Sequence, residues 1–112
     1  MFEALSVTMS IEKVVETAKG IISGEIGVIE GSRKLSSLRF DVTDVDHDPD
    51  FIPFVAIDSE SDHIPLGSVR DRWSETGIAK MDLERKETED HYRKWAIEAS
   101  EKLLERYAST NT

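Results

Sequence analysis

An apolar stripe with helical spacing near the end of the chain constrains the fold more than any other feature of the sequence. It comprises Tyr92, Trp95, Ala96, Ala99, Leu103 and Tyr107. Residues that recur every three or four positions lie on one face of an α-helix. Acid–base pairs spaced four residues apart, which stabilise helices, occupy the other side: Glu89 with Arg93, Asp90 with Lys94, and Glu98 with Lys102. We predict one long helix or two collinear helices over about 78–107, with Trp95 substantially buried.

A second stripe of the same period lies in the N-terminal part of the chain. It comprises Ile11, Val14, Val15, Ala18, Ile21 and Ile22. Ser10 precedes the stripe, and serine is a favoured N-cap, so we predict that a helix begins there. Gly20, Ser23 and Gly24 indicate a break, after which a second helix is predicted from about Glu25 to Leu38. Gly27 and Gly31 weaken that helix by about 1 kcal/mol each relative to alanine, so we expect another element to pack closely over them.

The middle of the chain, about 40–77, is the irregular part. Phe40 and Val42 alternate with polar residues, and a short apolar run covers 54–57, which together predict two strands of a β-hairpin around the turn at 46–50. The competing interpretation is a short helix that starts at Phe51, with Asp50 as N-cap and Pro53 in its first turn. The predicted fold is mainly α, a single domain over 1–112. It is a bundle of three or four helices with a short β-hairpin or extended insertion at about 40–60.

Charge is distributed unevenly along the chain. The net charge is −9, and the stretch from Asp41 to Val69 holds eight acidic residues without a lysine or arginine. Such a segment repels phosphate backbones, so we expect no nucleic-acid partner. A basic protein surface or a divalent cation would be attracted to it. The bases that flank the segment are expected to hold it against the helices: Arg33, Lys34, Arg39, Arg70 and Arg72. Because the eight acids outnumber these five bases, we also expect the acids to be exposed and to repel one another.

The location of the protein is predicted from what the sequence lacks. There are no cysteines, which weakly favours a reducing compartment and excludes thiolate zinc sites. The N-terminus shows neither the basic residues nor the apolar stretch of a signal peptide. The longest apolar run, 51–57, is far shorter than the roughly 20 residues of a membrane-spanning helix and contains Pro53. We predict a cytoplasmic protein without a membrane partner, either a monomer or a homodimer.

The acidic turn offers the first candidate site. Asp44, Asp46, Asp48 and Asp50 alternate like the opening ligands of an EF-hand calcium loop. The match fails at the sixth position, where Pro49 replaces the required glycine, and at the twelfth, where Val55 replaces the bidentate glutamate. We therefore interpret these four aspartates as an acidic surface, either solvated or available to a partner, and not as a metal site.

The densest set of functional residue types follows the predicted hairpin. It comprises Asp58, Ser59, Glu60, Asp62, His63, Arg70 and Trp73. Members of a catalytic triad usually come from separate elements, so a Ser/His/Asp triad drawn from six adjacent residues is disfavoured. Glu60 and Asp62 can act as paired carboxylates, or as metal ligands with His63. The simpler interpretation is local turn chemistry shaped by Pro65 and Gly67. No cofactor and no catalytic residue are predicted.

One run of the sequence resembles a known pattern. The residues F-V-A-I-D-S-E-S-D-H-I-P-L-G over 54–67, followed by Arg70 and Trp73, resemble a group of short bacterial proteins of unknown function. Gly24, Glu30, Gly31 and Leu35 extend the resemblance, which covers roughly residues 15 to 107. It implies a bacterial source and a stand-alone domain, and it brings no activity, cofactor or catalytic residue with it.

Two functional hypotheses follow. The first is a small acidic protein-binding module that offers its middle segment to a basic partner, analogous in charge and size to immunity or inhibitor proteins that block a basic toxin. The second is a small enzyme, or a metal- or metabolite-binding protein, with its site around residues 58–73. We expect binding in preference to catalysis, and the convergence of these side chains in one pocket would distinguish the two hypotheses.

Overall fold

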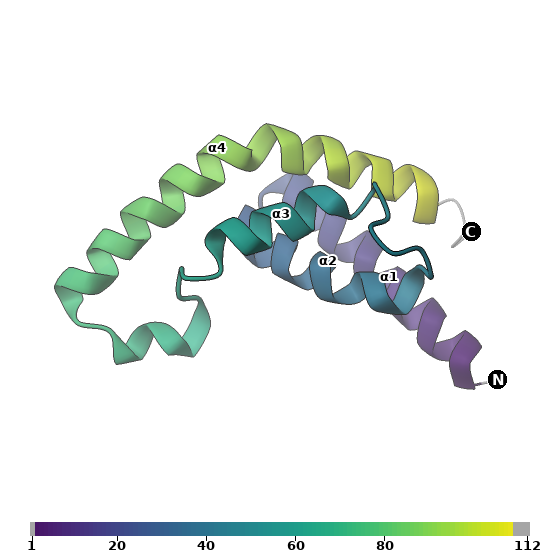
Figure 1. Ribbon diagram of the computed structural model, residues 1–112, viewed down its shortest axis with the longest axis horizontal. Helices are drawn as coiled ribbons and strands as arrows, with labels where there is room; N and C mark the ends of the chain where they lie inside the picture. The colour runs from purple at the N-terminus through teal and green to yellow at the C-terminus, as the bar shows by residue number, and fades with distance from the viewer. Residues whose placement is uncertain (1, 109–112) are drawn as a thin grey trace.

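The computed structural model describes residues 2–108, with side chains from residue 6 onward, and it is mainly helical, as predicted. The elements are α1 (Phe2–Ser23), α2 (Val28–Val42), α3 (Ile52–Ser61), the 3₁₀ helix η1 (Gly67–Arg72) and α4 (Glu75–Tyr107). Helix α2 packs between α1 and α3, and α4 arches across all three (Figure 1). The N-terminal half of α4 leaves the bundle and meets η1 away from it (Figure 1).

All four α-helices contribute to one hydrophobic core. Its buried members include Val14 and Ile21 of α1, Leu35 of α2, Phe54 and Ile57 of α3, and Leu103 of α4. Helices α1 and α2 approach closely because Gly31 carries no side chain. A Cβ at that position would lie 2.5 Å from Cδ1 of Ile21, which is inside van der Waals contact. The prediction that another element packs closely over Gly31 is therefore confirmed.

The ends of the first two helices differ from the prediction. Helix α1 begins at Phe2, so Ser10 is not an N-cap. It lies buried in mid-helix, and its hydroxyl donates a hydrogen bond to Asp41 Oδ2 at 3.5 Å. The break falls where the glycines indicate it, since α1 ends at Ser23 and Gly24 adopts a φ of 86°. Helix α2 starts at Val28, and Gly27 is its N-cap.

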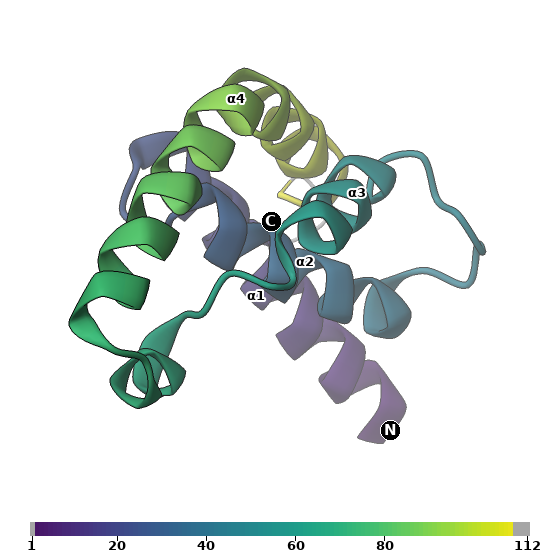
Figure 2. The same ribbon diagram turned by 60° about the vertical axis from the view of Figure 1, so that its left-hand side comes forward.

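The predicted β-hairpin at 40–60 is wrong, because residues 2–108 contain no strand. Phe40 and Val42 form the last turn of α2, and the apolar run 54–57 lies within α3. Phe54 and Ile57 are both fully buried, which requires i, i+3 spacing on one helix face. The competing interpretation, a short helix with Pro53 in its first turn, is correct, but the helix begins at Ile52 and Phe51 is its N-cap, so the predicted cap by Asp50 is wrong. Residues 43–51 form an irregular loop that projects from the bundle (Figure 2).

The long C-terminal helix confirms most of the predicted stripe but not Trp95. Ala96, Ala99, Leu103 and Tyr107 are buried, whereas Trp95 is 40% exposed. At 3.6 residues per turn Trp95 lies at the margin of the stripe, and only part of its ring is covered. It shares a small cavity with Pro49 and Pro53. The substantial burial predicted for Trp95 is therefore wrong.

The projecting half of α4 makes the molecule elongated. Its principal extents are 49, 29 and 25 Å, and its radius of gyration is 15.0 Å, compared with about 13 Å for a typical domain of 100 residues. Within residues 2–108, no helix combines the length and apolar character needed to cross a bilayer.

Candidate functional site

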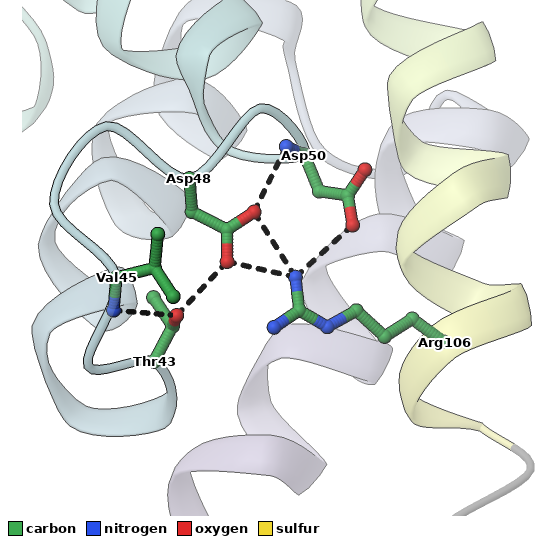
Figure 3. Close-up of polar contacts among 5 residues, drawn as sticks. All are labelled: Thr43, Val45, Asp48, Asp50 and Arg106. Atoms are coloured by element: carbon green, nitrogen blue, oxygen red, sulfur yellow. Dashed lines mark hydrogen bonds and ion pairs between the residues drawn. The ribbon is translucent and has the colours of Figure 1, made fainter.

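The acidic loop between α2 and α3 is organised by Asp48, whose side chain is only 5% exposed (Figure 3). Nη1 of Arg106 on α4 donates to both Asp48 carboxylate oxygens, at 3.1 and 2.9 Å, and to Asp50 Oδ2 at 3.0 Å. The Thr43 hydroxyl donates to Asp48 Oδ2 at 2.9 Å, and the Asp50 N–H donates to Oδ1 at 3.1 Å. These bonds attach the loop to the C-terminal end of α4.

These contacts also determine the ionisation of Asp48. Burial raises its pKa, but the hydrogen bonds from Arg106, the Asp50 N–H and Thr43 outweigh that effect. The pKa of Asp48 is therefore lowered from its ordinary value, and the carboxylate stays ionised. The expectation that all the acids of this segment are exposed and mutually repelling is wrong for Asp48. The cause is Arg106, a base that lies 58 residues away in sequence.

Asp44 and Asp46, in contrast, stay exposed on the loop. Asp48 and Asp50 are bound to a guanidinium, so the four aspartates do not form the calcium loop that their spacing resembles. Two apolar side chains lie beside the exposed acids, Phe40 with 73% and Val45 with 60% of its surface exposed. Phe40, Asp44, Val45 and Asp46 line one open cavity of about 260 Å³, and we call these four residues the 40–46 surface.

Local hydrogen bonds also hold the backbone of this loop in place. The Val45 N–H donates to the Thr43 hydroxyl at 3.2 Å, and the carbonyl of Asp48 accepts from the N–H groups of Phe51 and Ile52 at the start of α3. His47 adopts a φ of 59°, a left-handed conformation that non-glycine residues adopt rarely. The 40–46 surface thus combines Phe40, from the last turn of α2, with three residues of a loop that these bonds hold in place.

Asp58 faces Arg33 of α2 and not the other predicted site residues. Arg33 Nε lies 3.7 Å from Asp58 Oδ1, and its Nη2 donates to the carbonyl oxygens of Ser61 and, at 2.8 Å, Ile64. The guanidinium therefore binds the carbonyl of the last residue of α3 and one carbonyl of the turn that follows it. The predicted role of Arg33 as a base that holds the acidic segment against a helix is confirmed.

Arg70 and Trp73 lie together near the projecting end of α4. Both terminal nitrogens of Arg70 donate to the Asp82 carboxylate. The hydrogen bond to Asp82 raises the pKa of Arg70 and lowers that of Asp82. Arg70 thus pairs with an acid of α4, and the prediction that it holds the acidic segment is wrong. Trp73 is half-exposed and lies over Gly77, where an added Cβ would be 3.3 Å from the indole.

Among the residues predicted as a site around 58–73, Glu60 and His63 line a common cavity. It has a volume of about 380 Å³ between α3 and α4, and the α4 side contributes Glu84, Glu87 and His91. His63 Nε2 contacts Glu84 Oε1 at 2.5 Å. Ser59 and Asp62 are exposed at the surface. Within the described part of the chain no three His, Asp or Glu side chains are arranged to hold a metal ion.

The predicted 58–73 site is therefore divided into three separate contacts: Asp58 with Arg33, Arg70 with Asp82, and His63 with Glu84. Sequence reasoning missed the partners in α4. Asp82, Glu84 and Arg106 occur among the polar positions of a long charged helix, and nothing in their spacing indicates which residue each one contacts.

No protein-family model, curated protein or solved structure matches this chain. The resemblance to short bacterial proteins of unknown function stays a prediction.

Proposed function

We propose that this protein is an acidic protein-binding module that engages a basic protein partner through the 40–46 surface. The proposal includes the cytoplasmic location and the immunity- or inhibitor-like role inferred from charge and size. The observation that carries it is the exposure of Phe40, at the end of α2, and of Val45, which lies beside Asp44 and Asp46 on a loop that is anchored to the bundle.

The apolar part of the surface supplies an anchor. Aromatic residues are enriched among those that contribute most to protein–protein binding, especially when surrounded by a polar rim. Most of the Phe40 side chain is exposed, and the guanidinium of Arg39 lies 4.0 Å from the centroid of its ring. A ring stacked in this way loses less conformational freedom when a partner covers it.

The acidic rim supplies steering and selectivity. Asp41, Asp44 and Asp46 are exposed around the apolar pair, while Asp48 and Asp50 both pair with Arg106, whose single positive charge offsets one of the two carboxylates. These exposed carboxylates attract a basic surface, and steering of this kind raises the association rate at low ionic strength. The Asp48 network keeps the loop in place before binding, which lowers the ordering cost of association.

The experiment compares four immobilised proteins for retention of partners from a bacterial lysate at low and moderate salt. They are the wild type, Phe40→Ser with Val45→Ser, Asp44→Asn with Asp46→Asn, and the control Leu83→Ser. Leu83 is the matched control because its side chain is 59% exposed and lies on α4, away from the loop. Any retained protein is then purified, and its association rate is measured against ionic strength.

The expected result is a basic protein retained by the wild type and by Leu83→Ser. It should be lost by the Phe40/Val45 variant. The Asp44/Asp46 variant should bind more slowly, with a weaker dependence on salt. The proposal is overturned if no protein is retained at low salt, or if the retained protein binds all four forms equally.

The second hypothesis keeps one observation in its favour, the cavity that Glu60 and His63 share with α4. The other predicted site residues do not converge on that cavity, because Asp58 pairs with Arg33 and Arg70 pairs with Asp82. Thermal melting against a panel of polar metabolites and divalent cations tests it. A ligand at one hundred times its Kd should add about 2.7 kcal/mol of stability, and Glu60→Gln should remove that gain.

A further inference from the structure

A cavity of about 520 Å³ lies between α1 and α2, a volume within the range of about 300–1,000 Å³ that is typical of small-molecule sites. Apolar side chains of Ile26 and Leu38 line it, and both pack against the hydrophobic core. The cavity shares none of its lining residues with the 40–46 surface or with the cavity beside Glu60.

The charge of this cavity is opposite to that of the molecule. The chain carries a net charge of −9, yet three bases and one acid line the cavity, namely Lys13, Arg33, Lys34 and Glu16. Arg33 is already engaged with Asp58 and the carbonyls at the end of α3. Lys13 and Lys34 are different, since neither ammonium takes part in an ion pair within the described part of the chain.

The two lysines come from different helices and meet at one cavity. Lys13 lies on α1 and Lys34 on α2, so the packing of these helices brings together two charges that are 21 residues apart in sequence. The Ser37 hydroxyl adds a further hydrogen-bonding group to the wall. An apolar wall with a few convergent polar groups is the usual composition of a ligand pocket.

We propose that this cavity binds a small organic anion, a carboxylate attached to an apolar body. The carboxylate lies between the ammonium groups of Lys13 and Lys34, and the apolar body packs on Ile26 and Leu38. A metal cation is disfavoured by the excess of bases, and a nucleic acid is disfavoured by the net charge of the molecule. The inference is independent of the proposed protein partner, because it uses other residues.

The experiment titrates the full chain with 2-naphthoate and with 2-naphthamide, which has the same ring system but no charge, by isothermal calorimetry. The test variant is Lys13→Met with Lys34→Met. The matched control is Lys80→Met with Lys86→Met, which removes the same charge from exposed positions of α4. Far-UV circular dichroism and urea midpoints of all variants verify that each is folded.

We expect one saturable 2-naphthoate site in the wild type and in the control variant. The affinity for 2-naphthoate should fall about tenfold or more in the Lys13/Lys34 variant, because charge-assisted hydrogen bonds are lost. The uncharged 2-naphthamide should bind the wild type weakly for the same reason. The proposal is overturned if the wild type shows no saturable 2-naphthoate binding, if both probes bind equally, or if the two lysine variants bind 2-naphthoate alike. Displacement of 2-naphthoate by octanoate would show that the site also accepts an aliphatic body.

Discussion

The two halves of α4 have the same secondary structure but are held in different ways. The C-terminal half, residues 92–107, buries Ala96, Ala99, Leu103 and Tyr107 in the core. The N-terminal half, residues 75–91, contains no buried residue. It is attached by side-chain contacts, from Arg70 to Asp82 and from His63 to Glu84.

This difference predicts different local stabilities along one helix. Burial of apolar area is the main source of helix stability in a folded protein, and exposed ion pairs contribute little. Segments with few buried contacts open locally at a lower free energy than the core does. The N-terminal half of α4, together with η1, should therefore open while the C-terminal half stays folded. Four sets of variants test this contrast, and they are ordered by expected effect.

The largest effect is expected from the core of the C-terminal half. Leu103 is fully buried, so Leu103→Ala removes packed atoms and leaves a cavity. It should lower the free energy of unfolding by about 2–5 kcal/mol in urea melts. Leu83→Ala is the matched control in the N-terminal half, where the same truncation at a mostly exposed side chain should change stability by less than about 0.5 kcal/mol. Similar losses for the two variants would contradict the contrast between the halves.

The next effect is expected where a polar contact is buried. Asp48 joins the α2–α3 loop to Arg106 in the C-terminal half of α4. In Asp48→Asn the amide nitrogen faces donors from Arg106 or Thr43, so the variant should lose about 2 kcal/mol of stability. Asp46→Asn changes the same charge at an exposed position of the loop and should be nearly neutral. A neutral Asp48→Asn would mean that the loop is not held by this network.

The same carboxylate predicts a dependence of stability on pH. The folded pKa of Asp48 is lowered, so its contribution is present above the unfolded value of about 3.9 and is lost as pH falls through the folded value. Arg70 also lowers the pKa of Asp82, so the contribution of Asp82 to stability is likewise lost as pH falls. Wild-type melting temperatures should stay level from pH 7 to pH 5 and fall below about pH 4. Asp48→Asn should have a shallower acid limb, and an identical limb would contradict the lowered pKa.

The helical class and the stripe of α4 could be predicted because apolar periodicity reports local burial. The hairpin could not be excluded in this way, since a short apolar run such as 54–57 fits a strand or a buried helix. Pro53 was the correct signal for a short helix, whereas Asp50 does not cap that helix. The polar contacts could not be predicted from the sequence for another reason. Asp48 and Arg106 are 58 residues apart, and only the crossing of α4 over the bundle brings them together.

A smaller effect is expected at the boundary between the halves. Helix α2 begins at Val28, and its N-cap residue Gly27 has no side chain to cap the helix. Glu89 of α4 provides that cap, because its Oε2 accepts a hydrogen bond from the Ile29 N–H at 3.1 Å. A carboxylate there also interacts favourably with the helix dipole. Glu89→Ala should lower stability by about 1 kcal/mol.

Glu89→Gln separates the two parts of this contribution. Glutamine can still accept the hydrogen bond but lacks the charge, so its loss should be about half that of alanine. Glu87→Ala, on the same helix, serves as the control and should be close to the wild type. If Glu89→Ala and Glu87→Ala have the same stability, the cap on α2 contributes nothing measurable.

The smallest effect on global stability is expected from the Arg70–Asp82 pair. Both side chains are partly exposed, so solvent and salt screen their attraction. Arg70→Ala should leave the urea midpoint almost unchanged. It should nevertheless speed amide hydrogen exchange over residues 75–84, because the pair attaches the projecting half of α4 to η1. Exchange over 96–107 should keep its wild-type rate, since those residues open only with the core.

Arg72→Ala, which removes an exposed base from the same 3₁₀ helix, should leave the exchange rates of both regions unchanged. If Arg70→Ala speeds amide exchange equally in both halves, α4 opens as a single unit. The distinction between the half packed in the core and the half held by side-chain contacts would then be wrong.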